Sequence, residues 1–143
     1  MIYFKLSELC ITDDPIPQPI ADKLLKYHIT PMSVVRGKHG APIFASSHSG
    51  WRPEEYEKAR GRSGGSQHCF KDIDQVEGKG AVDWTAEDME QLLLDIIQYS
   101  TYTRVTYYKE DRFIHCDFKY TGDKGIKYFE SGSNSKWTFI KYV

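Results

Sequence analysis

Residues 103–120, TRVTYYKEDRFIHCDFKY, contain the feature that most restricts how this chain can fold. Two runs with strand-like alternation, 103–109 and 112–120, are joined by the polar turn KEDR. This pattern predicts an antiparallel hairpin, in which successive side chains point to opposite faces. One face of the second strand would carry Ile114, Cys116, Phe118 and Tyr120, and the other Phe113, His115, Asp117 and Lys119. The first face therefore predicts contact with a core, and the second predicts a polar cleft above the sheet.

The segment 85–100, TAEDMEQLLLDIIQYS, predicts the helix that would cover the apolar face of this hairpin. Its apolar residues form one helical stripe, made of Met89, Leu92, Leu93, Ile96 and Ile97. Thr85 followed by Asp88 resembles a capping box, so we expect the helix to begin at Thr85, with Asp83 just outside it. A final run, KWTFIKYV at 136–143, could add a third strand.

The first half of the chain has weaker signals. Proline-rich residues 14–19 precede apolar positions at helical spacing, which predicts a short helix over about 19–28, and Pro31 favours a second one over about 31–38. APIFASS, residues 41–47, predicts a strand. The long segment 47–66 should be mostly loop, with a turn of helix from Pro53, and loops of this length are usually functional when they are ordered.

Together these elements predict an α+β fold: a small antiparallel sheet with helices packed on one face and a cleft on the other. The 143 residues are enough for one sizeable core, so we expect a single domain over 1–143. Within it, 1–40 would form an N-terminal helical segment and 41–143 the core with the site.

Composition excludes several classes of partner. Nineteen basic and twenty acidic residues give a net charge of -1, without the basic excess typical of nucleic-acid binding. The N-terminal sequence lacks the uninterrupted apolar core of a signal peptide, and no run is long enough to cross a membrane. We therefore expect a monomer made in the cytoplasm, with no membrane insertion. The odd, widely spaced cysteines predict reduced thiols at Cys10, Cys69 and Cys116.

Three polar residues form a possible metal site. His68, Asp83 and His115 would supply two imidazoles and a carboxylate, a set that suits zinc and leaves a fourth position for water. A competing hypothesis is a structural zinc site in which Cys69 and Cys116 join the two histidines, but strand alternation directs Cys116 away from His115. Composition and spacing alone also allow ordinary surface or hydrogen-bonded core histidines.

Four motifs, in order, resemble one enzyme family. FKLSELC near the start is similar to its opening segment, and GAPIFASSHSGWRPEEYEKARGRSGGSQH to its progression from Pro-Ile through a strand and Ser-Gly-Tyr-Arg to Gly-Gly-Ser-x-x-His. GKGAVDW resembles its Gly-x-Ala-x-Asp element, and RVTYYKEDRFIHCDF its closing strand pair. The family is that of the zinc D-Ala-D-Ala carboxypeptidases and L-alanyl-D-glutamate endopeptidases of peptidoglycan, whose fold is shared by the hedgehog signalling domain.

The resemblance implies a role for particular residues. Residues 1–143 would form a single metallopeptidase-like domain with a zinc cleft on the face of the sheet away from the helices, and His68, Asp83 and His115 would be the zinc ligands. Ser66 matches a serine that contacts substrate, and Arg52 matches an arginine that binds or polarises the substrate near the scissile bond. An arginine fork can hold a carboxylate or stabilise a developing oxyanion, with a geometry that lysine does not offer.

The chain departs from the family in the spacing of its ligands. Fourteen residues separate His68 from Asp83, where the family usually has six, as if CFKDIDQV or a similar segment were inserted. A longer surface loop has a small entropic cost, so both ligands can stay in place. Asp72 and Asp74 become alternative oxygen ligands, although neither has the Gly-Ala-x-Asp context of Asp83.

A second departure concerns the general base. The family supplies a carboxylate a few residues before its last histidine, whereas this chain has Arg112 and Lys109 at the corresponding distances. Glu110 and Asp111 offer the nearest carboxylates, and both could instead be solvated turn residues. Asp117, on the same strand face as His115, could hold a cation or orient that ligand.

The expected function is a zinc peptidase that cleaves the stem peptide of bacterial peptidoglycan. A phage or prophage lysis enzyme, which acts on the cell wall once it is released, is one expected setting for this activity. One alternative is a binding module that keeps the fold and the zinc but lacks hydrolysis, which the missing carboxylate favours. Another is a structural phage or cell-surface protein without a metal.

Overall fold

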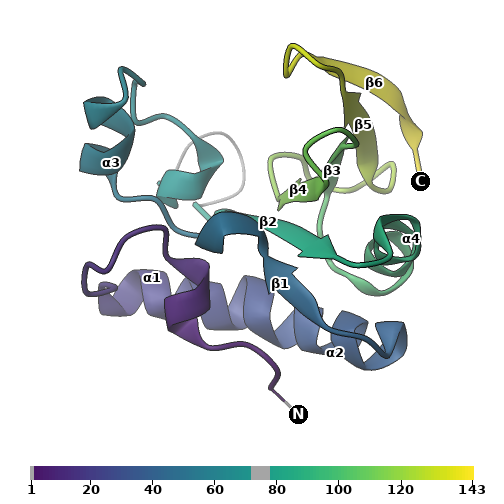
Figure 1. Ribbon diagram of the computed structural model, residues 1–143, viewed down its shortest axis with the longest axis horizontal. Coiled ribbons are helices and arrows are strands. Elements are labelled where there is room, and N and C mark those ends of the chain that lie inside the picture. The colour runs from purple at the N-terminus through teal and green to yellow at the C-terminus, as the bar shows by residue number, and fades with distance from the viewer. Residues whose placement is uncertain (1, 72–77) are drawn as a thin grey trace.

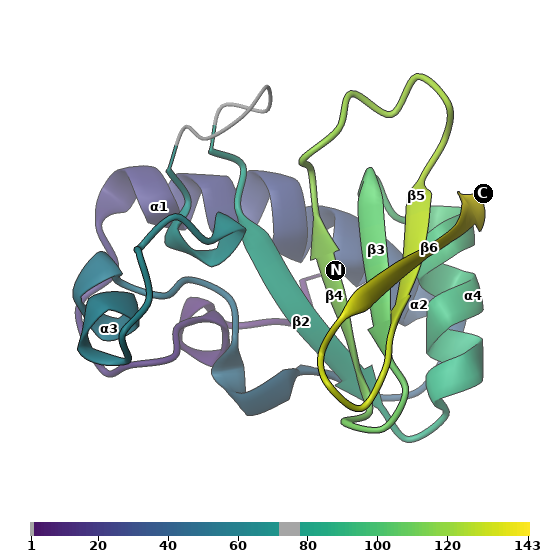
Figure 2. The same ribbon diagram turned by 90° about the horizontal axis from the view of Figure 1, so that it is seen from above.

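The computed structural model describes residues 2–71 and 78–143 and confirms the α+β class. Six strands form one sheet in the order β1-β2-β4-β3-β5-β6 (Figures 1 and 2). Their bounds are Ile43–Ala45 (β1), Ala81–Ala86 (β2), Arg104–Tyr108 (β3), Phe113–Asp117 (β4), Lys127–Ser131 (β5) and Trp137–Tyr142 (β6). The sheet is mixed rather than wholly antiparallel, because β5 runs parallel to β3 while the other pairs are antiparallel. Strand β5 has no counterpart among the predicted elements.

The described helical segments include four α-helices: Gln18–Lys23 (α1), Thr30–His39 (α2), Glu54–Ala59 (α3) and Met89–Tyr99 (α4). A π-helix, Leu24–Ile29 (η2), joins α1 to α2, and three short 3-10 helices cover Leu6–Leu9 (η1), Ser46–His48 (η3) and Gln67–Cys69 (η4). In Figure 1, α1 and α2 run along the base of the molecule beneath β1 and β2, and α3 stands on the opposite side from β5 and β6. The turn of helix predicted after Pro53 is α3.

The N-terminal helices are continuous, so the predicted division into two short helices is wrong. Thr30 keeps helical dihedral angles although it precedes Pro31, where a break was expected. A proline inside a helix removes one hydrogen bond and crowds the preceding turn. The π-helix Leu24–Ile29 ends two residues before this proline, and the chain continues into α2 without a break.

The predicted start of the central helix is also wrong. Asp88, not Thr85, is the N-cap of α4, and its Oδ1 accepts a hydrogen bond from the backbone N–H of Gln91 at 3.1 Å. Thr85 belongs instead to β2, which is paired with β1 on one side and β4 on the other. The apolar, β-branched character of AVDWTA favours a buried strand between two neighbours. Asp83 therefore lies in the middle of the sheet, directly opposite His115.

The two faces of the hairpin β3–β4 have the predicted character. Ile114 and Cys116 are fully buried in the hydrophobic core, to which α2 and α4 contribute, whereas His115 and Asp117 lie on the other face. We call the latter the site face. All three cysteines are free, and Cys116, packed in the core, lies on the side of β4 opposite His115, as the argument against a His-Cys zinc site expected. None of the helices described is long and apolar enough to span a membrane.

Candidate metal centre

Three side chains from distant parts of the sequence meet on the site face. Asp83 of β2 is paired in register with His115 of β4, and its Oδ1 lies 2.9 Å from Nδ1 of that histidine. His68, from the 3-10 helix η4, completes the group: its Nε2 is 3.2 Å from Asp83 Oδ1 and 3.2 Å from His115 Nδ1. All three residues are buried. The structure thus brings together the three residues that the sequence suggested as ligands, in a group that could hold a metal ion.

Local structure fixes the orientation of His68. Ser66 is the N-cap of η4, and its Oγ accepts a hydrogen bond from the backbone N–H of His68 at 3.2 Å. On the ring, Nδ1 lies 2.8 Å from the carbonyl oxygen of Gly50. A carbonyl only accepts hydrogen bonds, so Nδ1 carries the proton and the lone pair of Nε2 points into the cluster.

The ring of His115 is oriented by a hydrogen bond from its other nitrogen, Nε2. Its Nε2 lies 2.7 Å from Oδ2 of Asp117, two residues along the same strand face. Arg104 of β3 contacts this carboxylate with Nε at 3.0 and 2.9 Å and also with Nη2. The carboxylate, ionised beside an arginine, accepts the Nε2 proton, so the lone pair of Nδ1 faces Asp83 and His68. Asp117 therefore pairs with a cation, Arg104, and orients His115.

The electrostatics of the cluster require a positive charge at its centre. Two imidazole lone pairs and a carboxylate oxygen face one another, and the outer nitrogen of each ring is already committed to an acceptor. Burial lowers the pKa of His115, but Asp117 and Asp83 outweigh that effect and raise it to about 9. Burial likewise opposes ionisation of Asp83, yet His68 and His115 hold its pKa well below the usual range. A proton or a metal cation can supply this charge, and the nitrogen and oxygen donors are those that zinc prefers.

Asp83 has further partners that the sequence did not predict. Ser49 Oγ donates a hydrogen bond to Asp83 Oδ2 at 2.9 Å, and the backbone N–H of Asp83 donates to the Ser49 carbonyl at 2.8 Å. Arg52 Nη2 lies 2.7 Å from Ser49 Oγ and 3.3 Å from Asp83 Oδ2. The second carboxylate oxygen is thus held from the side away from the histidines, which leaves Oδ1 directed at the cluster.

A buried glutamate positions Arg52. Glu57 of α3 is fully buried, and its carboxylate pairs with Nη1 of Arg52 at 3.2 Å and Nη1 of Arg62 at 2.6 Å. Burial raises the pKa of Glu57, but the two arginines lower it overall, so the group is ionised. The polar segment PEEYEKARGR gave no sign of which glutamate points inward, because a six-residue helix has too few turns for a readable stripe.

The cluster opens into a pocket of about 460 Å³. Arg52 and Ser66, the predicted substrate-binding residues, both line it. Its other lining residues outside the cluster are Gly65, Gln67, Arg104, Tyr108, Phe113, Lys119 and Trp137. Apart from Asp83, no carboxylate is among the described lining residues.

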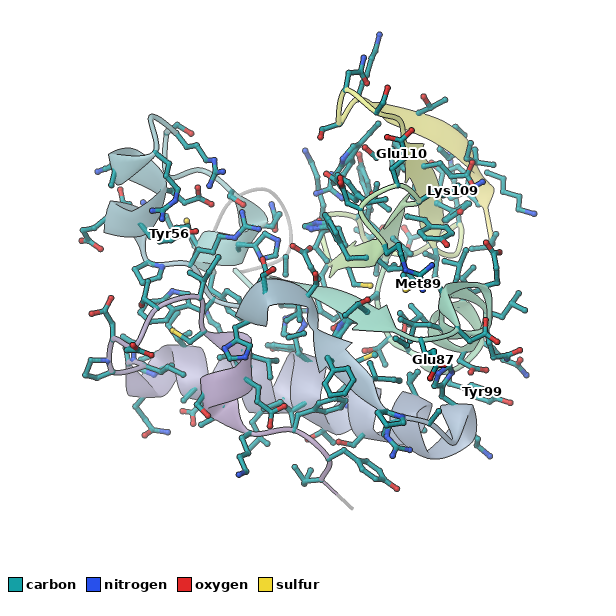
Figure 3. The ribbon with its side chains drawn as sticks, in the orientation of Figure 1. Tyr56, Glu87, Met89, Tyr99, Lys109 and Glu110 are labelled. Carbon is teal, nitrogen blue, oxygen red and sulfur yellow. The ribbon has the colours of Figure 1, made fainter. Side chains whose placement is uncertain are left out.

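The predicted base residues lie elsewhere. Glu110 and Asp111 are exposed in the turn between β3 and β4, and neither lines the pocket. Figure 3 shows Glu110 beside Lys109, on the opposite side of the molecule from Tyr56 of α3. Asp72 and Asp74, the alternative oxygen ligands, lie outside the described residues.

Comparison with known proteins adds an independent finding. A family model described as Peptidase M15 matches residues 2–117, a range that contains the whole cluster and ends at Asp117. No curated protein and no solved structure matches the chain.

Proposed function

The chain belongs to the peptidase M15 family, and from this premise we propose that it hydrolyses the stem peptide of peptidoglycan, as a D-Ala-D-Ala carboxypeptidase or an L-Ala-D-Glu endopeptidase. Membership implies a zinc peptidase that acts on peptidoglycan. The observation that carries the proposal is the convergence of His68 Nε2, His115 Nδ1 and Asp83 Oδ1 at the base of an open pocket.

The donor set of the cluster supports zinc as the cofactor. His68, Asp83 and His115 would hold the ion through the three atoms that already face one another. When bound, zinc would supply a Lewis acid that activates water and polarises the peptide carbonyl. Three protein ligands are typical of catalytic zinc sites, which keep one position for a reactant.

Substrate binding would depend on the cations of the pocket. Arg52, Arg104 and Lys119 all line it, and a stem peptide carries carboxylates. The side chain of Arg52 is 20% exposed and is held by Glu57 and Ser49, so its guanidinium is positioned before substrate binds. Ser66, at the rim beside His68, would contact the peptide backbone.

Glu110 and Asp111 remain the proposed source of the general acid/base. Their turn joins β3 to β4, the strand that carries His115. Both are exposed, so either would need to turn toward the pocket when substrate binds. We further propose that the protein reaches the cell wall through a membrane pore, as in phage lysis. Expressing it in bacteria with and without a membrane pore protein, and measuring cell lysis, would test this.

A second candidate function is a zinc-containing binding module of the same fold. The absence of any carboxylate other than Asp83 from the described pocket lining favours it, because hydrolysis needs a group that can accept a proton from water. A binder would use the same pocket and the same cations.

The decisive experiment is mass spectrometry of purified muropeptides incubated with the zinc-loaded protein, beside a chelator-treated control. Zinc-dependent loss of the terminal D-Ala, or separation of L-Ala from D-Glu, would establish the enzyme and identify the bond. Intact muropeptides, with one zinc retained per chain, would overturn hydrolysis and leave the binding module.

A further inference from the structure

An aromatic surface begins at the pocket and continues across the last two strands. It consists of Phe129 of β5 and Trp137, Phe139 and Tyr142 of β6, and we call it the aromatic track. These residues follow the matched range 2–117, so the family does not account for them. Trp137 lines the pocket, whereas the other three lie beyond it.

Strand pairing places the track on the site face. Thr106 of β3 is paired with His115 on one side and with Phe129 on the other, so the same face of the sheet runs from the cluster to β5. Phe129 is in turn paired with Phe139. Tyr128, the neighbour of Phe129, is only 5% exposed and belongs to the core on the opposite face.

Trp137 connects the pocket to the track. Its ring centroid lies 5.3 Å from that of His115 and 5.7 Å from that of Phe129. Its indole N–H donates a hydrogen bond to the Tyr108 hydroxyl at 2.6 Å, and the Arg104 guanidinium lies 4.7 Å from its ring. These contacts hold the ring as a fixed wall of the pocket.

The outer part of the track is open to solvent. Phe139 is 45% exposed and Tyr142 is 42% exposed, and their ring centroids are 5.3 Å apart. The ring centroid of Phe139 also lies 5.7 Å from that of Phe129. Single exposed aromatic residues are common, but a contiguous set that continues from a pocket marks an interaction surface.

Positive charge accompanies the rings. Lys127 Nζ lies 5.5 Å from the Phe129 ring and 5.4 Å from the Phe139 ring, and Lys124 Nζ lies 5.7 Å from the Tyr142 ring. Residues 104–143 contain eight Lys or Arg against five Asp or Glu, although the whole chain has a net charge of -1. Lys124 and Lys127 place positive charge beside the rings, which suits a ligand that packs on aromatic side chains and also carries carboxylates.

We infer that the aromatic track binds the glycan strand of peptidoglycan, next to the stem peptide in the pocket. A pyranose ring offers a C–H face that packs on an aromatic ring and a polar edge that hydrogen-bonds, while the carboxylates of neighbouring stem peptides complement the lysines. Continuity with the pocket matters because the glycan is the polymer to which the stem peptide is attached. The inference rests on the proposed function in naming this substrate class.

Binding to insoluble peptidoglycan tests the inference directly. Sacculi stripped of attached anionic wall polymers are sedimented with the wild type, with Phe139→Ala, with Tyr142→Ala and with the double variant. The matched control is Phe44→Ala: Phe44, on β1 at the other edge of the sheet, is 56% exposed. Each track variant should weaken binding by about tenfold, the loss expected for one aromatic anchor, and Phe44→Ala should leave it unchanged. Zinc content and unfolding temperature should stay at the wild-type values in all of them.

The outcomes separate this inference from the proposed function. Oligosaccharides of β-1,4-linked N-acetylglucosamine should compete with sacculi for the wild type. Equal binding of sacculi by Phe139→Ala and Phe44→Ala would overturn the inference. So would a wild-type dimer in sedimentation velocity that Phe139→Ala converts to a monomer, because a second copy of the chain would then cover the aromatic track. Intact muropeptides combined with track-dependent binding would overturn hydrolysis alone, because sedimentation does not require catalysis.

Discussion

Asp117 and His115 lie two residues apart on one face of β4, and the aspartate Oδ2 is 2.7 Å from the outer ring nitrogen of the histidine. Burial opposes ionisation of Asp117, but His115 and Arg104 lower its pKa to about 2. The carboxylate is therefore charged at neutral pH, and it fixes which His115 nitrogen faces the cluster.

Replacing that charge should weaken the metal site. Asp117→Asn can still accept a hydrogen bond from His115 Nε2, but it no longer raises the basicity of the ring. We expect zinc affinity to fall by about 10- to 100-fold, the usual effect of removing a carboxylate behind a histidine ligand. Competition with a chromogenic chelator measures it. Asp123→Asn is the control, because Asp123 is exposed, and equal affinities in the two variants would contradict the role of Asp117.

The placement of His115 and Asp117 on one face could be predicted because it depends on local alternation alone. Alternation in RFIHCDF directs His115 and Asp117 to one face and Cys116 to the other, and the structure has this arrangement. That His68 and Asp83 meet them depends on long-range pairing, which single-sequence patterns do not contain. For these two residues the prediction came from family motifs rather than from periodicity.

The features that could not be predicted from the sequence also have physical causes. The charged Lys127 and Glu130 of KYFES mask β5, because this strand contributes only Tyr128 to the hydrophobic core and so needs no continuous apolar run. Thr85 and Asp88 imitate a capping box because threonine is common both in strands and at N-caps, and here the strand residue Thr85 precedes the true N-cap, Asp88, by three positions. Ser49 acts on Asp83 through tertiary contact alone, so no spacing rule could have identified it.

Removal of either histidine should abolish stoichiometric zinc binding. His68→Ala and His115→Ala each leave two protein ligands, which is too few for a stable site. Elemental analysis of dialysed protein measures zinc per chain. His48→Asn is the matched control: His48 is exposed with a φ of 53°, a conformation that asparagine tolerates. Retention of a full zinc equivalent by both alanine variants would refute this site.

The turn carboxylates should separate an enzyme from a binder. The double variant Glu110→Gln, Asp111→Asn removes both proposed bases without touching the described pocket lining. If either is the base, turnover should fall by about 100-fold or more while zinc content is unchanged. Turnover of muropeptides and zinc stoichiometry are measured on the same preparation. Full activity in the double variant would exclude both residues from catalysis.

A buried histidine outside the site should make stability fall in acid. His28 is 0% exposed; its Nε2 lies 2.8 Å from the Lys79 carbonyl and its Nδ1 lies 2.8 Å from the Tyr102 hydroxyl. The carbonyl must accept, so Nε2 carries the proton and Nδ1 accepts from Tyr102. Protonation would therefore break the Tyr102 hydrogen bond and bury a charge. Burial lowers the pKa of His28 from 6.5 to about 4.

Because this folded-state pKa lies below the unfolded value, the neutral ring contributes stability that is present above pH 6.5 and is lost as the pH falls toward 4. The loss over that window is about 3 kcal/mol. Urea unfolding from pH 8 to pH 4, with chelator present so that zinc release does not contribute, compares the wild type with His28→Gln. The variant should be less stable than the wild type at pH 8, since glutamine does not fill the imidazole site. At pH 4 the difference in unfolding free energy between the two proteins should be smaller by about 3 kcal/mol. A difference in unfolding free energy that stays constant from pH 8 to pH 4 would mean that His28 does not titrate in this window in the folded protein.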